Sequence, residues 1–247
     1  VDGVTPTRSL IEAIDGNTSL VAVSEVQSAT GFRVDLRALS DRCRDKGARL
    51  FVNATQALGA LRLDASEIPV DYVAAHGYKW LLGPRGAAWL YVRPDRLEEL
   101  APLAPSWKSV ELPYDEYYGG PFEPAPDARK LDTSLAWFSW PGARAALELL
   151  DGFDAAAIER HCLDLARAFR DSAAARGMDL VPEEVPSQIV GVVAPDPDGL
   201  QVRLRERKVV AAVRGGFLRV GFHAFNDAAD VEAALAALRE AEPSFGS

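Results

Sequence analysis

Residues 48–86, ARLFVNATQALGALRLDASEIPVDYVAAHGYKWLLGPRG, decide the fold that the sequence predicts. Two apolar runs within them, 48–52 and 70–75, are short, β-prone and flanked by turn residues, which is typical of buried strands in a parallel sheet. Parallel strands joined by a crossover end at the same edge of the sheet, where open α/β sheets bind ligands. The polar residues that follow the two runs, and that we expect at this edge, are Asn53, Gln56, His76, Tyr78 and Lys79.

Lys79 has the most distinctive chemistry of this stretch. It lies between the aromatic residues Tyr78 and Trp80 and is followed by two leucines. Such surroundings remove water from an ammonium group and lower its pKa, and a neutral lysine can attack an aldehyde to form a Schiff base. Taken alone, a lysine before a turn of glycine and proline is more simply interpreted as a solvated loop charge.

The spacing of several elements resembles a known family. These elements are ATQALG at 54–59, VD at 70–71, GYKWLLGP at 77–84 and the glycine at 86. Together they look like the class V aminotransferases, fold-type I pyridoxal-phosphate-dependent enzymes that include cysteine desulfurases and isopenicillin-N-epimerase-like enzymes. The resemblance implies that Lys79 holds pyridoxal 5'-phosphate as a Schiff base and that Gln56 hydrogen-bonds near the phenolic oxygen of the cofactor. His76 and Tyr78 are candidates for the cofactor phosphate or for proton transfer; a buried structural histidine is the alternative for His76.

Asn53 departs from the family pattern, which places an aspartate here to pair with the protonated pyridine nitrogen. A neutral amide offers no such ion pair, so the ring is a weaker electron sink. Three interpretations remain open at this point: altered chemistry, a degenerate subunit or an engineered change.

Further site residues are implied by the resemblance. Gln27 and Ser28 take the place of side chains that reach the phenolic oxygen, although an ordinary strand-to-helix turn is the alternative. Thr133 and Ser134 take the place of a segment that, in the family dimer, crosses to the partner's cofactor phosphate. Ser134 is also interpreted as the N-cap of the helical pattern that ends near Leu150.

Two arginines are candidates for the α-carboxylate of a substrate, because a guanidinium binds a carboxylate through two hydrogen bonds. By position in the resemblance, Arg214 is the first candidate and Arg219 the second; a surface ion pair is the alternative. His223 and Asn226 are interpreted as turn-formers, with Asn226 expected to cap the last helix.

Composition and charge limit the partners. The 247 residues are 48% hydrophobic and carry a net charge of −9, which argues against nucleic acid or an anionic membrane as a partner. No apolar run is long enough to span a bilayer and no signal peptide is recognised, so we expect the cytoplasm.

Cys43 and Cys162 lie in predicted helices without metal-ligand spacing; we interpret them as buried, and this argues against a persulfide-forming desulfurase.

The alternation of strands and helices predicts an α/β fold with a mostly parallel sheet and helices on both faces. We expect a large cofactor-binding domain over 1–150, incomplete at its N-terminus, and a smaller α+β domain over 151–247. The segment 87–92 should be an antiparallel strand by resemblance, and 155–175 a long helix. The loop 101–129 carries aromatic residues that would line a substrate mouth or a subunit interface, with simple packing anchors as the alternative; they are Trp107, Tyr114, Tyr117, Tyr118 and Phe122.

The predicted function is a pyridoxal-phosphate-dependent enzyme that acts on an amino acid or amine. Transamination, epimerisation and elimination share their opening steps, so the reaction type stays open. The alternative is a degenerate or partner-dependent subunit that keeps the fold for assembly. The chain would form a homodimer, or a hetero-oligomer with a chain that supplies the N-terminal part.

Overall fold

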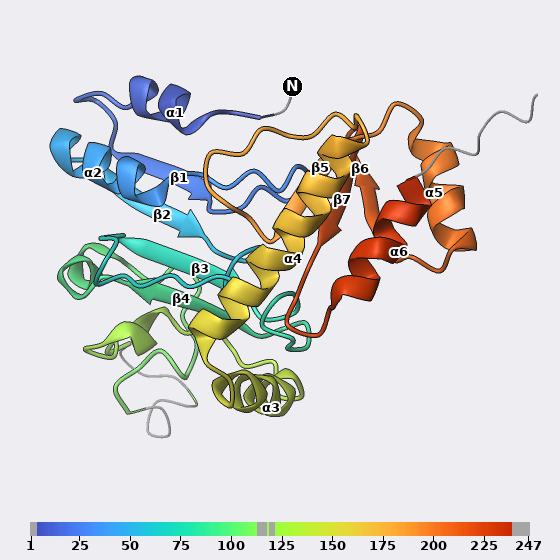
Figure 1. The fold of residues 1–247 in the computed structure, drawn as a ribbon. Coiled ribbons are helices and arrows are strands. Elements are labelled where there is room, and N and C mark those ends of the chain that lie inside the picture. Colours follow the sequence, from blue (N-terminus) through green and yellow to red (C-terminus); the bar gives the residue numbers. More distant parts are fainter. Residues whose placement is uncertain (1–3, 113–117, 119–121, 239–247) are drawn as a thin grey trace, which may run out of the picture.

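The structure is a computed structural model, and it describes residues 4–112, 118 and 122–238 (Figure 1). The predicted loop residues Tyr114 and Tyr117 lie outside this described part. The helices and strands of the first part of the chain are α1 (Thr7–Ala13), β1 (Leu20–Ser24), α2 (Leu36–Lys46), β2 (Arg49–Asn53), β3 (Tyr72–His76), β4 (Ala88–Val92) and the 3-10 helices η1 (Pro94–Glu99) and η2 (Ala128–Leu131). Those of the second part are α3 (Ser139–Asp151), α4 (Ala155–Ala175), β5 (Ile189–Val193), α5 (Pro197–Glu206), β6 (Ala212–Arg214), β7 (Phe217–Gly221) and α6 (Ala228–Leu238).

The first sheet has the strand order β1-β2-β3-β4. Its first three strands are parallel and β4 is antiparallel to β3, which confirms the predicted direction of each. The register aligns Ser24 with Asn53 and Asn53 with Ala74. The ends of β1, β2 and β3 therefore meet at one edge, and the turns that follow them lie side by side.

One face of this sheet packs against α1 and α2. Leu39 and Cys43 of α2 join Leu50 and Val52 of β2 in the buried core, and each fully buried leucine contributes about 1.5–3 kcal/mol relative to an exposed one. The opposite face carries Leu20 and Leu90, which are 53% and 48% exposed. The mostly parallel α/β sheet is confirmed, and within the described residues its apolar core lies on the side of α2.

The helix ends follow the sequence signals. Asp35 accepts a hydrogen bond from the backbone N–H of Ala38 at the start of α2, and Gly47 ends that helix with φ +73°. Asp154 caps α4 in the same way. Helix α4 has the predicted bounds, and in both helices a side-chain acceptor satisfies an N–H group at the first turn that has no helical partner.

The second sheet has the order β5-β7-β6 and is antiparallel throughout. Helices α4, α5 and α6 cover one of its faces, with Phe169, Leu204, Leu218 and Leu235 in the core between them (Figure 1). This is the α+β arrangement expected for the C-terminal part. Within the described residues, no helix is both long and apolar enough to cross a membrane.

The two sheets meet where the strands of the first sheet end. A Cβ on Gly31 would lie 2.4 Å from the carbonyl oxygen of Ile189, and one on Gly191 would lie 2.3 Å from that of Thr30. Only glycine allows backbones to approach so closely. The side chain of Gln188 also donates a hydrogen bond to the carbonyl oxygen of Gln56. The second sheet is thereby held against the turns that follow β1 and β2.

Candidate active site

Lys79 lies on a tight turn after β3, at residues 77–83, which we call the lysine turn. The N–H of Gly83 donates to the carbonyl of Gly77 at 2.8 Å, and the N–H of Leu82 donates to the carbonyl of Lys79 at 3.0 Å. Burial lowers the pKa of Lys79 below its usual 10.5, and the positive charges of Arg219 and Arg214 lower it further. More of the amine is therefore neutral at a given pH than in a solvated lysine.

Gln56 is the centre of a row of hydrogen bonds beside Lys79. Its amide nitrogen donates to Oγ of Ser28 at 2.7 Å, and its amide oxygen accepts from Nε1 of Trp80 at 3.0 Å. Nη1 of Arg219 donates to the carbonyl oxygen of Ser28 at 2.7 Å. Because the indole N–H can only donate, the amide oxygen of Gln56, and not its nitrogen, must face Trp80. Trp80 was not predicted to have this role.

Lys79, Gln56 and Arg219 line one pocket of about 650 Å³ between the lysine turn and the second sheet. Arg214, at the end of β6, is exposed and is not among the residues that line it. Phe217 packs in the core of the first sheet, and a Cβ on Gly221 would lie 3.1 Å from the ring of Trp80. Arg219 lies between these two residues on β7 and alternates with their neighbours, so it is on the same face, which points to the first sheet. The structure therefore places the second arginine candidate, rather than the first, in the pocket with the lysine.

The backbone around the pocket is strained at two places. Leu82 and Lys208 have φ of 56° and 57°, and among the described residues they are the non-glycine residues with positive φ. Both line the pocket that contains Lys79. A left-handed conformation costs a non-glycine residue about 1–3 kcal/mol, and such residues concentrate at functional sites.

His223 holds the lysine turn from the second sheet. Its ring stacks between those of Trp80 and Phe225, with centroids 5.4 and 4.9 Å away. Nδ1 accepts from the N–H of Ala224, so Nε2 carries the proton that is donated to the carbonyl oxygen of Trp80 at 2.8 Å. Burial lowers the pKa of His223, although the Trp80 carbonyl opposes this shift. The two hydrogen bonds of the His223 ring and its lowered pKa therefore both favour the neutral form.

His223 and Asn226 form the predicted turn, since the N–H of His223 donates to Oδ1 of Asn226 at 2.9 Å. The expected cap of the last helix by Asn226 is wrong. Oδ1 of Asp227 instead accepts from the N–H groups of Ala229 and Asp230. The helix begins one residue later than expected, at Ala228, because Asn226 is already engaged in the turn.

Asn53, Gln27 and His76 are exposed at the end of the first sheet. Oδ1 of Asn53 accepts from the N–H of Thr55 at 3.0 Å, and Oε1 of Gln27 accepts from the N–H of Ala29. Both side chains thus bond to their own turns. The alternative of a buried structural His76 is wrong, because its strand end reaches solvent; its ring lies 5.5 Å from that of Tyr78.

Tyr78 places its ring among positive charges. Nζ of Lys79 lies 5.8 Å and the guanidinium of Arg85 lies 4.7 Å from the ring centroid. The negative face of the ring attracts a cation at these distances. Tyr78 therefore contacts the lysine through its ring.

Thr133 and Ser134 are exposed on the segment before α3. The prediction that Ser134 caps the helix is wrong, because α3 begins at Ser139. A helix that began after Ser134 would place Pro141 in its interior, where it removes a hydrogen bond; in the first turn proline is tolerated.

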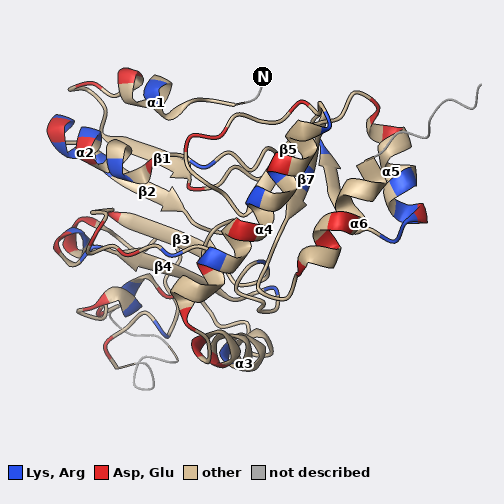
Figure 2. Cartoon of the chain, viewed as in Figure 1, with Lys and Arg blue, Asp and Glu red and all other residues tan. Residues whose placement is uncertain are grey.

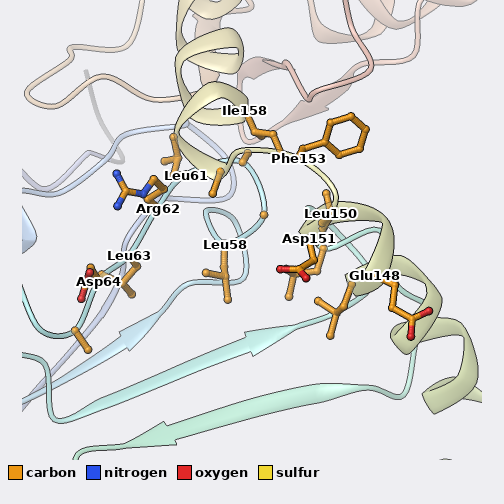
Figure 3. A pocket seen from close by; sticks show the side chains of 16 residues that line it. Leu58, Leu61, Arg62, Leu63, Asp64, Glu148, Leu150, Asp151, Phe153 and Ile158 are labelled. Atoms are coloured by element: carbon orange, nitrogen blue, oxygen red, sulfur yellow. The ribbon is translucent and has the colours of Figure 1, made fainter.

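A second hollow, shown in Figure 3, is lined by the segment after β2, by Leu81 and by residues of α3 and α4. Its volume is about 730 Å³, and Leu58, Leu61, Leu150, Phe153 and Ile158 supply much of its apolar lining. It contains none of the predicted site residues. Cys43 and Cys162 are buried as expected, and burial raises the pKa of the Cys162 thiol to about 11.

Comparisons with known proteins identify the family of this chain. The family model for aminotransferase class-V matches residues 1–194. The uncharacterized aminotransferase YcbU of Bacillus subtilis (strain 168) is 31% identical over 238 residues, which make up 95% of this chain and 63% of YcbU.

Two solved structures share the fold. The apo cysteine desulfurase from Thermococcus onnurineus NA1 has a TM-score of 0.80 at 20% identity, over 95% of this chain and 62% of that one. A C-DES mutant with glycine covalently linked to its PLP cofactor has a TM-score of 0.80 at 23% identity, over 93% of this chain and 62% of that one. The chain thus spans about 62–63% of the length of these proteins. It belongs to the class V aminotransferase family of pyridoxal-phosphate-dependent enzymes.

Proposed function

We propose that this chain binds pyridoxal 5'-phosphate through a Schiff base with Lys79 and acts on the amino group of an amino acid. The observation that carries this proposal is a lysine of lowered pKa that lines one pocket with Gln56 and Arg219. Within the described residues, this lysine makes no ion pair with an acidic side chain. Family membership and the covalently linked PLP in the similar C-DES structure support the same cofactor.

The residues of the pocket fit the chemistry of the cofactor in most respects. An amine of lowered pKa suits an aldehyde, and the positive charges of Arg214 and Arg219 suit an anionic ligand. The amide nitrogen of Gln56 and the hydroxyl of Ser28 are donors that suit a phenolate. Asn53 does not fit, because an amide cannot form an ion pair with a pyridinium.

Each of these residues has a proposed task. Pyridoxal phosphate supplies an aldehyde and a ring that withdraws electrons from the substrate. Lys79 would hold the aldehyde group of the cofactor, and as a free amine it would accept a proton from the substrate Cα, because its lowered pKa keeps part of it neutral. Gln56 is oriented by Trp80 and hydrogen-bonds beside the cofactor. His76, Tyr78, Gln27 and Asn53 are the remaining candidates at this edge of the sheet.

Arg219 is the first candidate for the α-carboxylate of the substrate, because it lines the pocket of Lys79. Arg214 contributes a positive charge from the end of β6. Transamination, epimerisation and elimination all begin with these contacts. A desulfurase that forms a persulfide on its own cysteine is disfavoured, since both cysteines are buried.

A second candidate function is a subunit that keeps the fold but depends on a partner or has lost catalysis. Asn53 favours it, because the neutral amide weakens the electron sink. The exposed Thr133 and Ser134 are available to a second subunit, in a homodimer or in a complex with a chain that supplies further parts of the site. Both candidates use the same fold, and they differ in whether Lys79 carries the cofactor.

The test is to incubate the purified chain with pyridoxal phosphate, record the visible spectrum, reduce with borohydride and map the labelled peptide. We expect an absorption band and label at Lys79, and neither in Lys79→Ala. Lys79→Ala is a suitable control because this side chain makes no ion pair with the described residues. A spectrum without the band, together with an unlabelled Lys79, would overturn the proposal for the chain alone. Asn53→Asp should strengthen substrate turnover if the first function holds.

A further inference from the structure

The pocket of Lys79 is strongly positive in a chain whose net charge is −9. Arg207, Lys208 and Arg219 line it together with Lys79. Within the described residues, none of these four side chains forms an ion pair with an acidic one. Figure 2 shows basic residues at the end of α5 and on the segment after it, where Arg207 and Lys208 lie.

Asp230 is an acidic residue of the same pocket, and its carboxylate is hydrogen-bonded within its own turn. Oδ2 of Asp230 accepts from Nδ2 of Asn226 at 2.9 Å and from the N–H of Asp227 at 3.1 Å. These bonds lower the pKa of Asp230 and keep it within the turn before α6. Asp230 keeps its negative charge, but within the described residues it forms no ion pair with any of the four cations.

Lys208 occupies a position where glycine is the usual residue. It is the second residue after α5, next to the C-cap Arg207, and has φ +57°; the N–H groups of Lys208 and Val209 close the end of the helix on the carbonyls of Arg205 and Leu204. Helices commonly end in this way with glycine, because glycine adopts positive φ without strain. The chain thus keeps a charged side chain at a position where glycine would be more stable.

The positive charges lie at two separate places along the pocket. Arg219 pairs in register with Ala212 of β6, whereas Lys208 precedes β6 by four residues. An extended chain advances about 3.3 Å per residue, so the backbones of Lys208 and Ala212 are at most about 13 Å apart. The segment between them carries Val209, Val210 and Ala211, which line the pocket with apolar surface.

We propose that the substrate has a second carboxylate, which Arg207 and Lys208 bind while Arg219 holds the first. The methylene groups between the two carboxylates would lie along Val209 and Val210. An amino acid with an acidic side chain, or the corresponding oxo acid, has this chemistry. The proposal rests on the proposed function, since it names the substrate class of that site. The same two side chains would also suit the phosphate of a cofactor, which the test separates.

The test measures anion binding on the chain without cofactor. Modification of Lys79 by an amine reagent is followed by peptide mass mapping, while glutarate, butyrate or inorganic phosphate is added as protecting anion. We expect half-protection at a glutarate concentration about five- to tenfold below that of butyrate, because two exposed charge contacts each contribute a few-fold. Lys208→Gly and Arg207→Gln should each reduce this preference, and the double variant should abolish it.

Two comparisons separate binding from folding. Lys208→Gly relieves the positive φ, so its urea midpoint should be equal to or above that of the wild type while its preference for glutarate falls. Arg205→Gln removes an exposed charge from the same helix that does not line the pocket, and it should keep the preference. Equal protection by glutarate and butyrate overturns the proposal, and so does an equal loss of preference in Arg205→Gln.

Phosphate that protects more strongly than glutarate, and that loses this protection in the same variants, would also overturn the dicarboxylate proposal in favour of a phosphate site. The assay needs no cofactor. A chain that discriminates glutarate from butyrate but is not labelled by pyridoxal phosphate would contradict the proposed function alone. A chain that is labelled but does not discriminate would contradict this inference alone.

Discussion

Gly59 lies in close contact with the lysine turn, and from this contact we predict the effect of Gly59→Ala on stability and on Lys79. Gly59 has φ +107°, and a Cβ on it would lie 2.3 Å from the carbonyl oxygen of Trp80, whereas ordinary contact begins at 3.4 Å. Gly59→Ala therefore forces Trp80, and Lys79 next to it, to move by about 1 Å. The strained φ costs about 1–3 kcal/mol and the overpacking about 1–3 kcal/mol, so we expect a loss of about 2–6 kcal/mol in the free energy of unfolding.

Urea unfolding of the chain measures this loss. Gly47→Ala is the matched control, because Gly47 also has positive φ, +73°, but a Cβ there meets nothing within 4 Å. The control should lose only about 1–2 kcal/mol, from the left-handed conformation alone. Displacement of the turn should also expose Lys79 and raise its pKa toward 10.5, which the pH dependence of its modification reports. Equal losses in the two variants, with no change in the pKa of Lys79, would refute the reasoning.

Three further predictions follow from the buried and charged groups. Because burial lowers the pKa of His223 below 6.5, the unfolded chain takes up this proton first as the pH falls. Stability should decrease from pH 6.5 downward, and His223→Gln, measured by urea unfolding at pH 7 and 5, should reduce that slope; an unchanged slope would contradict the shift. Arg219→Gln should raise the pKa of Lys79 only in part, since burial, the larger cause, remains; the pH midpoint of amine modification measures this, and Arg205→Gln should leave it unchanged. Asp71 is buried, accepts from the N–H of Leu50 at 2.8 Å and pairs with Arg93 and Arg96. Asp71→Ala should therefore cost about 2–4 kcal/mol in urea unfolding, and a cost below 1 kcal/mol would contradict a role in holding β2.

The sequence predicts those parts of the site that depend on local order. Short apolar runs predict β2 and β3, and the parallel arrangement then brings Gln56 and Lys79 to one edge. The long helix predicted over 155–175 has these bounds, and Asp154 satisfies its first turn through a bond to a near neighbour. These predictions succeed because the interactions that decide them lie within a few residues along the chain.

Such local patterns do not predict contacts between segments that are far apart in the sequence. The indole N–H of Trp80 bonds to Gln56, 24 residues away, and Arg219 reaches Ser28, 191 residues away. Neither the order of the two arginine candidates nor the orientation of the Gln56 amide follows from spacing. Both depend on how the second sheet packs against the first.

The sequence by itself thus determined the parallel strands, the capped helices and the lysine at the end of a strand. The tertiary structure decided that Arg219 shares the pocket of Lys79, that His223 clamps the lysine turn, and that Arg207 and Lys208 add positive charge there. The physical reason is that hydrophobic periodicity fixes which face of an element is buried. Pocket shape, burial and the resulting pKa shifts arise only when two sheets formed from opposite ends of the chain meet.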